Sequence, residues 1–377
     1  MTTRQLNGVL AAIAALAVWS TATSAQRPAP PITGGNGLLY MGTYAGDIQI
    51  LDEATEKLTA SIKLKTGIPR RLVLSRDHTR FYVLDASLEK FEIVDIASRT
   101  TLDTFTLSQG NQHVRARSYQ VDPLNRFAIL VARAATRHTD RWEIGSNTLL
   151  YYDFAQKKVT RTIPWPKGEE REAAEIRFSP DGSLMYIFAE DVTIYETANF
   201  TQVDTWELSR PVEPGFGEVR FGAVDDLNDD TGFFTGLFTV QDPVQNRRLM
   251  GIGRVNLAAK SVDFTEIGPA QPVDFVLAPG REKAYGLMQQ IGRYEFWTFD
   301  LKQKKLASRT EFQGRPRMAL RVSSNGKLLY VYQAGATIDV YDATTFRYLH
   351  TITMSADQTT ALFVLPRPPT PPSTSRP

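Results

Sequence analysis

Short apolar runs alternate with turn-forming residues along most of the chain, and one pattern recurs. An apolar strand ends in an acid or amide, two to four turn formers follow, and a second strand begins, as in VYDATTF at 340–346. The acid or amide occupies seven positions: Asp52, Asp95, Asp153, Glu196, Asn256, Asp300 and Asp342. Their spacings are 43, 58, 43, 60, 44 and 42 residues. A period of about 43 residues with two enlarged units indicates stacked supersecondary units.

A second pattern precedes the acid in each unit. It is clearest in IRFSPDGSLMYIFAE and LRVSSNGKLLYVYQA, where an apolar strand, a turn ending in Asp-Gly or Asn-Gly and another apolar strand follow one another. Such a dipeptide predicts a tight hairpin, since both residues tolerate a positive φ. Each unit is therefore predicted to contain four antiparallel strands, A to D. The recurrent acid is predicted to begin the C-to-D turn by accepting hydrogen bonds from N–H groups two residues on, a structural role and not a catalytic one.

Four-stranded units at this period predict the blades of a β-propeller. The first unit has strands B, C and D in LLYMGTY, DIQILD and LTASIKL but no strand A, whereas a spare apolar strand, TALFVLP, follows the seventh unit. Pairing of the spare strand with the N-terminal strands would complete the first blade. The sequence thus predicts an all-β fold, a seven-bladed β-propeller over residues 38–366.

The ends of the chain have a different composition. Residues 1–25 combine Arg4, an apolar run of eleven residues and small residues up to Ala25, which predicts a Sec-type signal peptide and a periplasmic or secreted protein. The alternative, a retained membrane anchor, is disfavoured because eleven residues are too few to span a bilayer, and no other segment is long enough. Residues 26–37 and 367–377 are rich in Pro and are predicted to be extended tethers.

Charge and cysteine content narrow the function. The chain has 43 Lys and Arg against 41 Asp and Glu, so nothing draws it as a whole toward nucleic acid. It has no Cys, which excludes disulfides, thiolate metal clusters and covalent haem attachment within this chain. No cofactor is predicted in this chain, and any partner must be recognised locally.

The loops indicate where binding is expected. In a propeller, the D-to-A connections and B-to-C turns lie on one face, and both enlarged units are enlarged between B and C, at 133–146 and 238–251. Long loops on a rigid scaffold often carry binding sites. Basic and aromatic residues of this face form the candidate ligand or partner site: Arg70, Arg71, His113, Arg115, Arg117, Arg141, Trp142, Arg171, Arg220, Arg315 and Arg317.

A ring of guanidinium groups suits a carboxylate, a phosphate or an acidic partner surface, because the planar fork binds such groups bidentately. Acidic residues of the same connections leave internal ion pairing as the alternative: Glu169, Glu170, Glu172, Glu175, Glu218 and Asp274. No metal site is predicted. The segment Asp226, Asn228 and Asp230 only loosely resembles a calcium loop, because its Gly comes late and no Glu follows at position twelve.

The repeats resemble a known family. LLYVYQAGATIDVYDATTFRYLHTI and RFYVLDASLEKFEIVDIASRTTLDTFTL look like the YVTN-type β-propeller repeats of exported proteins. The whole arrangement is similar to the β chain of quinohaemoprotein amine dehydrogenase and, more distantly, to the heavy chain of methylamine dehydrogenase. In those enzymes the propeller is a docking platform and a small partner subunit carries the quinone cofactor. The resemblance therefore implies at most a noncatalytic subunit.

Three hypotheses for function result. The first is an exported, noncatalytic binding or scaffolding module for a protein partner or a small anionic ligand. The second is the propeller subunit of an amine-dehydrogenase-like redox complex. The third is a propeller hydrolase, similar to a lactonase, which would require His113 to join Glu175 or Glu218 at the mouth of the central funnel.

Overall fold

The computed structural model describes residues 32–189, 191–207, 215–217, 219–225, 227–314, 318–333 and 335–367. The predicted signal peptide lies outside these residues, as do Arg315 and Arg317 of the candidate site. Within the described ranges, no helix has the length and apolar character needed to cross a membrane. One short 3₁₀ helix, η1 (Pro166–Gly168), accompanies an otherwise all-β unit.

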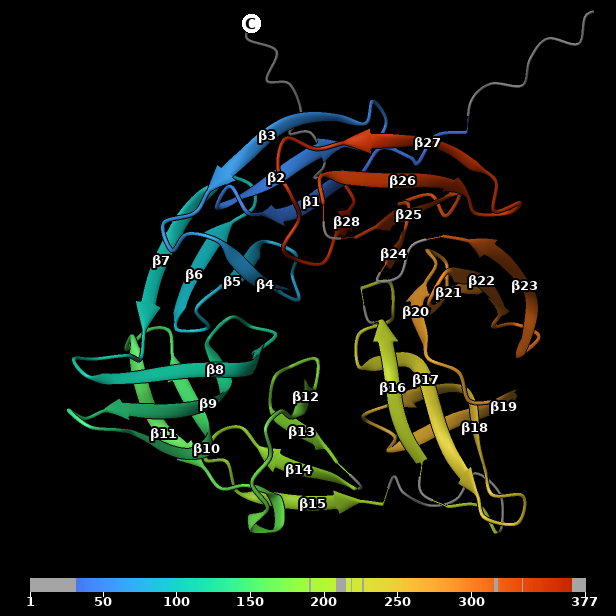
Figure 1. The fold of residues 1–377 in the computed structure, drawn as a ribbon. Coiled ribbons are helices and arrows are strands. Elements are labelled where there is room, and N and C mark those ends of the chain that lie inside the picture. Colours follow the sequence, from blue (N-terminus) through green and yellow to red (C-terminus); the bar gives the residue numbers. More distant parts are fainter. Residues whose placement is uncertain are drawn as a thin grey trace, which may run out of the picture. The chain divides into compact units, whose positions relative to one another are not determined.

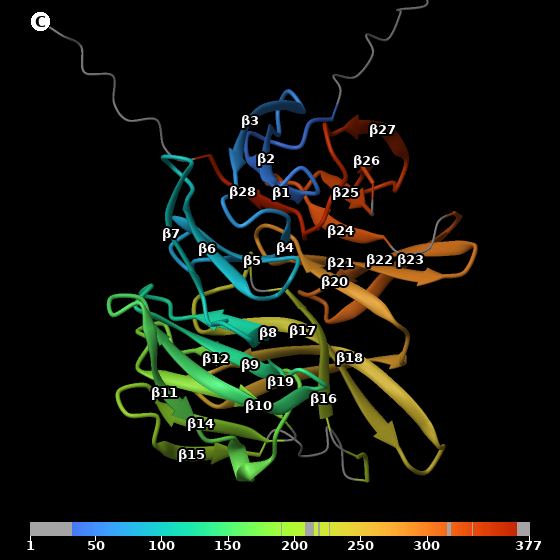
Figure 2. The same ribbon diagram turned by 60° about the vertical axis from the view of Figure 1, so that its left-hand side comes forward.

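The strands form seven antiparallel sheets of four strands each, arranged as the blades of a propeller (Figure 1, Figure 2). Blade 1 contains β28 (Phe363–Leu365), β1 (Leu38–Thr43), β2 (Asp47–Asp52) and β3 (Lys57–Lys63). Blade 2 contains β4 (Pro69–Leu74), β5 (Arg80–Asp85), β6 (Lys90–Asp95) and β7 (Thr100–Thr106). Blade 3 contains β8 (Gln112–Val121), β9 (Phe127–Arg137), β10 (Trp142–Asp153) and β11 (Lys158–Ile163).

The remaining blades have the same order. Blade 4 contains β12 (Glu175–Phe178), β13 (Leu184–Phe188), β14 (Val192–Glu196) and β15 (Gln202–Trp206). Blade 5 contains β16 (Val219–Asp225), β17 (Phe233–Asp242), β18 (Arg247–Asn256) and β19 (Ser261–Pro269). Blade 6 contains β20 (Val273–Leu277), β21 (Lys283–Gln290), β22 (Arg293–Asp300) and β23 (Lys305–Gln313). Blade 7 contains β24 (Ala319–Val322), β25 (Leu328–Tyr332), β26 (Thr337–Asp342) and β27 (Tyr348–Thr353).

The two ends of the chain close the ring in the predicted way. Strand β28 pairs antiparallel with β1, Leu38 opposite Leu365 and Tyr40 opposite Phe363, so a C-terminal strand supplies the innermost strand of blade 1. Figure 1 shows this red strand beside the blue strands of the N-terminus. The predicted seven-bladed fold with this closure is confirmed.

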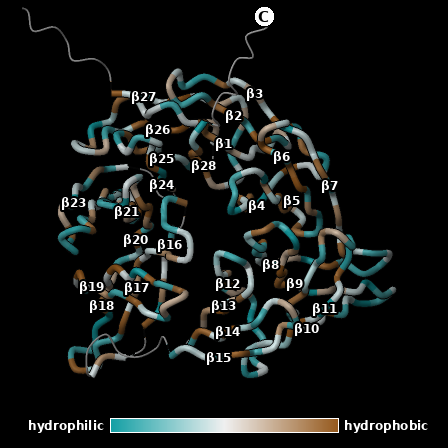
Figure 3. Tube along the Cα trace, turned by 180° about the vertical axis from the view of Figure 1, so that it is seen from behind, coloured by the Kyte–Doolittle hydropathy of each residue, from teal (hydrophilic) through white to brown (hydrophobic). Residues whose placement is uncertain are grey.

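Apolar clusters between consecutive blades hold the ring together. Tyr186, Phe234 and Val255, for example, pack between blades 4 and 5, and each of the other six junctions has a cluster of its own. Figure 3 shows hydrophobic stretches along the strands, while many of the turns are hydrophilic. Outer strands such as β7 alternate exposed and half-buried residues, since only one of their faces packs against a neighbouring blade.

Backbone hydrogen bonds place the connections on the two faces as the propeller pattern predicts. The B-to-C turn of blade 2 bonds to the preceding D-to-A connection, Ala86 N to Ile68 O at 2.8 Å. On the other face, the C-to-D turn of blade 3 bonds to its A-to-B turn, Phe154 N to Arg126 O at 3.1 Å. The enlargements at 133–146 and 238–251 lie between B and C but are mostly strand, because β9–β10 and β17–β18 continue outward as long hairpins.

The recurrent acids begin their turns, but their hydrogen bonds span three residues and not the predicted two. In six of the seven copies the side-chain oxygen accepts a hydrogen bond from the N–H three residues on, as in Asp52 to Thr55 at 2.8 Å and Asp95 to Ser98 at 2.7 Å. Asp342 also accepts the predicted bond from the N–H two residues on, that of Thr344. The longer side chain of Glu196 makes neither bond, but its carbonyl accepts a hydrogen bond from Phe200 N at 2.8 Å, as the Asp52 and Asp342 carbonyls do from the N–H groups four residues on.

The A-to-B turns also differ from the prediction. Several contain a single residue with positive φ instead of two, for example His78, Asn125 and Gly182. In three of them a Ser at the first position fixes the turn with its hydroxyl, and Ser179 Oγ accepts a hydrogen bond from Leu184 N at 2.9 Å. The Ser N–H still donates to the carbonyl of the same partner, Ser179 N to Leu184 O at 2.9 Å, so the hydroxyl replaces one of the two backbone hydrogen bonds that a two-residue turn would provide.

Every C-to-D turn places a non-glycine residue in the left-handed region, four residues after its acid or amide. These residues are Glu56, Arg99, Lys157, Phe200, Lys260, Lys304 and Phe346, with φ between 47° and 59°. A Cβ in this region costs about 1 kcal/mol relative to glycine.

We expect Arg99→Gly to raise the free energy of unfolding by about 0.5–1 kcal/mol, because Arg99 is exposed and its left-handed backbone suits glycine better. Chemical denaturation would measure the change. The control, Arg99→Ala, also removes the long side chain but keeps Cβ, and should bring no gain. Equal stabilisation by both variants would contradict the backbone explanation.

A buried carboxylate fastens the start of the unit to blade 7. Glu53 is fully buried and accepts hydrogen bonds from Gly37 N and Ser324 N, both at 2.8 Å, and from the Tyr330 hydroxyl at 3.1 Å. Asn325 Nδ2 also donates to Thr33 O at 2.8 Å. The described end of the predicted linker, residues 32–37, therefore packs on the ring, which its Pro-rich composition did not predict.

Candidate functional site

A cavity of about 910 Å³ occupies the centre of the ring. The innermost strands of blades 2 to 5 line it, together with Arg321 of β24 and Phe363 of β28. It also reaches between blades 4 and 5, where Phe188, Phe234 and Leu257 contribute to its wall. A volume of this size is within the range of pockets that hold small organic ligands.

The lining is strongly cationic. Its described residues include seven arginines: Arg70, Arg71, Arg76, Arg171, Arg177, Arg220 and Arg321. The only carboxylates among the described lining residues are Glu175 and Asp225. Guanidinium groups remain charged at every physiological pH, so the cavity has a lasting positive excess that favours an anion.

Part of this charge is compensated internally, as the alternative interpretation predicted. Arg177 contacts Glu175 at 2.6 Å, and Arg171 contacts Glu169 at 3.3 Å. By contrast, Arg70 and Arg71 have no salt bridge to any carboxylate of the described residues.

Arg321, on β24, is less closely compensated than Arg177. Its Nε donates a hydrogen bond to the Leu362 carbonyl at 2.9 Å, and its Nη1 lies 3.9 Å from Asp225 Oδ2. On the neighbouring strand β20, desolvation by the surrounding protein raises the pKa of Asp274 above its ordinary value, and the charge of Arg321 opposes that rise. The Arg321 guanidinium thus lies near two acids without a close salt bridge to either.

Two of the cavity arginines lie over aromatic rings. The Arg71 guanidinium is 5.4 Å from the centre of the Tyr119 ring, and the Arg177 guanidinium is 5.3 Å from that of Phe234. The Tyr119 hydroxyl donates to the Tyr82 carbonyl at 2.7 Å, and burial raises the pKa of Tyr119, so its ring stays neutral. These contacts orient each guanidinium without neutralising it.

Polar atoms without partners also occur at the cavity wall. Ser118 Oγ and Arg171 Nε are buried and have no hydrogen-bond partner among the described residues. Ser118 follows a bulge in β8, where the register with β9 shifts between Ala116 and Ser118. A buried polar group without a partner is costly, which makes these two atoms candidates for ligand contacts.

The structure brings together only part of the candidate site. Arg70, Arg71, Arg171 and Arg220 line the cavity, whereas His113, Arg115, Arg117, Arg141 and Trp142 do not. The sequence interpretation missed Arg76, Arg177 and Arg321. Arg177 and Arg321 each lie within a short A strand, in EIRF and ALRV, so an alignment of the seven blades on their A strands could have found both.

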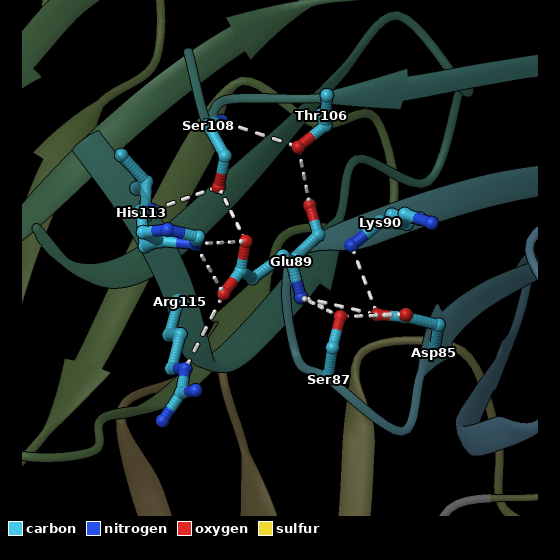
Figure 4. Close-up of polar contacts among 9 residues, drawn as sticks. Asp85, Ser87, Glu89, Lys90, Thr106, Ser108, His113 and Arg115 are labelled. Carbon is cyan, nitrogen blue, oxygen red and sulfur yellow. Dashed lines mark hydrogen bonds and ion pairs between the residues drawn. The ribbon is translucent and has the colours of Figure 1, made fainter. Parts of the chain in front are cut away.

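His113 belongs instead to a polar cluster between blades 2 and 3 (Figure 4). Its Nδ1 lies 3.1 Å from Glu89 Oε2, Ser108 Oγ donates to the same oxygen at 2.8 Å, and Arg115 Nε lies 3.5 Å from Glu89 Oε1. Burial raises the pKa of Glu89, but the hydrogen bonds of Ser108 and His113 outweigh it, so the pKa is lowered overall. This carboxylate therefore stays ionised and fixes the start of β8.

The other residues of that region are exposed or paired nearby. The Trp142 ring lies 5.5 Å from the His113 ring, and Arg141 contacts Asp140 at 3.2 Å. The hydrolase hypothesis required His113 to join Glu175 or Glu218. The structure instead pairs Glu175 with Arg177, and Glu218 lies outside the described residues.

The calcium-like segment is occupied by ion pairs. Asp230 contacts Arg254 at 2.8 Å and Arg281 at 2.6 Å, and Asn228 Nδ2 donates to the Leu277 carbonyl at 2.9 Å. Asp226 is outside the described residues. In the part of the chain that the structure describes, no three His, Asp or Glu side chains are grouped so that they could hold a metal ion.

Comparisons with known proteins agree with this fold. No protein-family model matches the sequence, and no curated protein matches it. Among solved structures, a functionally unknown protein from Desulfotomaculum acetoxidans DSM 771 is similar with a TM-score of 0.53 and 14% identity, covering 88% of this chain and 99% of the other. The periplasmic gluconolactonase PpgL of Pseudomonas aeruginosa has a TM-score of 0.52 and 13% identity, covering 89% and 100%.

Apo AztD from Citrobacter koseri is a third similar structure, with a TM-score of 0.51 and 13% identity, covering 89% of this chain and 99% of the other. Likenesses at such low identity support the fold and carry no residue of a site across. The fold and the cavity together define the class: a seven-bladed β-propeller with an arginine-lined central cavity.

Proposed function

We propose that this chain is an exported, noncatalytic binding protein whose central cavity holds a small anionic ligand. The observation that supports this most directly is the excess of seven arginines over two carboxylates among the described lining residues. Arg70 and Arg71 are the main anchors, because neither has a salt bridge to a carboxylate of the described residues. The proposed export depends on the signal-like pattern of residues 1–25.

A guanidinium fork binds a carboxylate or phosphate with two parallel hydrogen bonds, each stronger than a neutral bond. Removing one such anchor is expected to weaken binding by about 10- to 100-fold, since hydrogen bonds to charged groups contribute about 1.5–3 kcal/mol.

Isothermal titration calorimetry with citrate and with inorganic phosphate tests the proposal. We expect binding by the unaltered protein, a loss of about 10- to 100-fold in affinity for Arg71→Gln, and a larger loss when Arg70→Gln is added. The matched control is Arg248→Gln, an exposed residue that does not line the cavity and should leave affinity unchanged. If the control weakens binding as much as Arg71→Gln, the cavity is not the site.

A second candidate function is docking of a protein partner on the face of the B-to-C turns. Five large apolar side chains at or beside these turns are exposed: Tyr44, Trp142, Ile144, Val244 and Ile291. Ile291 is 97% exposed and Val244 is 87% exposed, the highest values among the large apolar residues described. Apolar residues in such positions are frequent anchors of protein interfaces.

The amine-dehydrogenase-like hypothesis is a narrower form of this second candidate, in which the partner is a small subunit with a quinone cofactor. Affinity capture of the tagged protein from its native envelope fraction tests both. A reproducible partner whose capture is lost with Val244→Asp and Ile291→Asp would support docking, and a quinone-bearing partner would support the narrower form. Capture that is unchanged by these substitutions would exclude this face.

A further inference from the structure

One sector of the central cavity is aromatic. Partly buried phenylalanines from blades 4, 5 and 1 line the cavity as a whole, and the aromatic sector is the part between blades 4 and 5: Phe178, Phe188, Phe221, Phe233 and Phe363. Two of them, Phe188 and Phe221, border the space between blades 4 and 5, where the buried ring of Phe234 lies 5.1 Å from Phe188 and 5.4 Å from Phe221. Phe178 packs instead between blades 3 and 4, and Phe363 packs between blades 1 and 2. Rings that are left partly exposed in a cavity leave apolar surface for a ligand to cover.

The aromatic sector adjoins the cationic lining. Arg177 lies over Phe234, so a charged guanidinium and the aromatic group share one stretch of wall. Between blades 2 and 3, Arg71 of β4 and Tyr119 of β8 form a second pair of this kind, and the buried Ser118 Oγ next to Tyr119 has no partner among the described residues. A purely inorganic anion would use the arginines but would leave the phenylalanines in contact with water.

We infer that the ligand is an organic anion with a flat apolar body, for example an aromatic carboxylate. This inference rests on the proposed function and adds the class of ligand. The acid group contacts the guanidinium groups, and the flat body lies against the phenylalanines between blades 4 and 5. Aromatic rings prefer offset-stacked or edge-to-face contacts, which this wall provides from several directions.

The predicted gain from the apolar body is measurable. Burial of apolar surface contributes about 25 cal/mol per Å², so each ~55 Å² covered corresponds to about tenfold in affinity. A bicyclic ring that buries even half of its surface should therefore bind at least about tenfold more tightly than a carboxylate without a ring.

The test uses four probes in titration calorimetry with the full chain: acetate, 2-naphthoate, 2-naphthalenemethanol and inorganic phosphate. We expect 2-naphthoate to bind at least about tenfold more tightly than acetate and than the neutral alcohol, because it alone uses both parts of the wall. Phe188→Ala should remove most of the advantage over acetate while leaving phosphate binding intact. Arg71→Gln should weaken every anion.

Phe188→Leu provides the matched control, since it keeps apolar volume at the wall, and thermal unfolding of each variant shows whether it folds. Equal affinity for acetate and 2-naphthoate, or an advantage that survives Phe188→Ala in a folded protein, would overturn the inference but leave anion binding in place. Absence of binding by all three anions would overturn the proposed function itself.

Discussion

Glu53→Gln is expected to lower the free energy of unfolding by about 3 kcal/mol, the upper end of the cost of leaving a buried hydrogen-bond donor without its acceptor. Glu53 is completely buried, and its two carboxylate oxygens accept hydrogen bonds from the backbone at Gly37 and Ser324 and from the Tyr330 hydroxyl. Glutamine has the same shape, but its amide nitrogen cannot accept. At least one backbone donor would then be left buried and unpaired.

Chemical denaturation of the two proteins measures this difference. The control is Glu266→Gln, an exposed residue of β19, which should change stability by less than about 0.5 kcal/mol. Adding Ser324→Ala to each protein completes a double-mutant cycle that isolates the coupling between Glu53 and blade 7. A loss no larger than that of Glu266→Gln would show that Glu53 does not fasten the ring.

A chain ending at Thr359 is expected not to fold cooperatively. It lacks β28 and the fully buried Leu362, and it leaves the edge of β1 unpaired beside Leu39 and Tyr40. Each buried Leu or Val contributes about 1.5–3 kcal/mol, so the lost residues are worth about 5 kcal/mol or more, comparable with the whole stability of a typical domain.

Circular dichroism during thermal unfolding and limited proteolysis would measure the effect. A chain ending at Arg367 is the control, because it keeps every contact of the described residues, and it should unfold like the full chain. A cooperative transition at an unchanged temperature for the shorter chain would contradict closure by β28. Since Phe363 also lines the cavity, the shorter chain should lose ligand binding as well.

Closure and binding are connected by the same strands. The innermost strand of a blade contributes alternate side chains to the packing between blades and to the central cavity. In β12, for example, Ile176 is buried between blades 3 and 4, while Arg177 faces the cavity and lies over Phe234. A rigid ring of seven sheets therefore holds the arginines at fixed positions around one space, which limits the entropy that a ligand would lose in ordering them.

The sequence by itself determined the repeat, the strand order and the closure. Each turn is specified by residues close together in the chain, such as Asp95 and Ser98, so the periodic pattern is readable without tertiary contacts. The missing A strand of the first unit and the spare strand at the end made closure the arrangement that gives blade 1 the same four strands as the other blades. Because the four strands of each blade run antiparallel, the strand order also determined which turns lie on which face of the ring.

Only the tertiary structure decided which basic residues meet. Arg115 and Arg71 both lie near the start of an A strand, yet Arg115 contacts Glu89 between blades while Arg71 faces the cavity. The bulge after Ala116 changes which side chains of β8 point inward, and a one-residue shift of register reverses the facing of every side chain beyond it. Glu53 and Ser324 are far apart in the chain and form their hydrogen bond only in the closed ring. The local sequence around either residue therefore could not predict this contact.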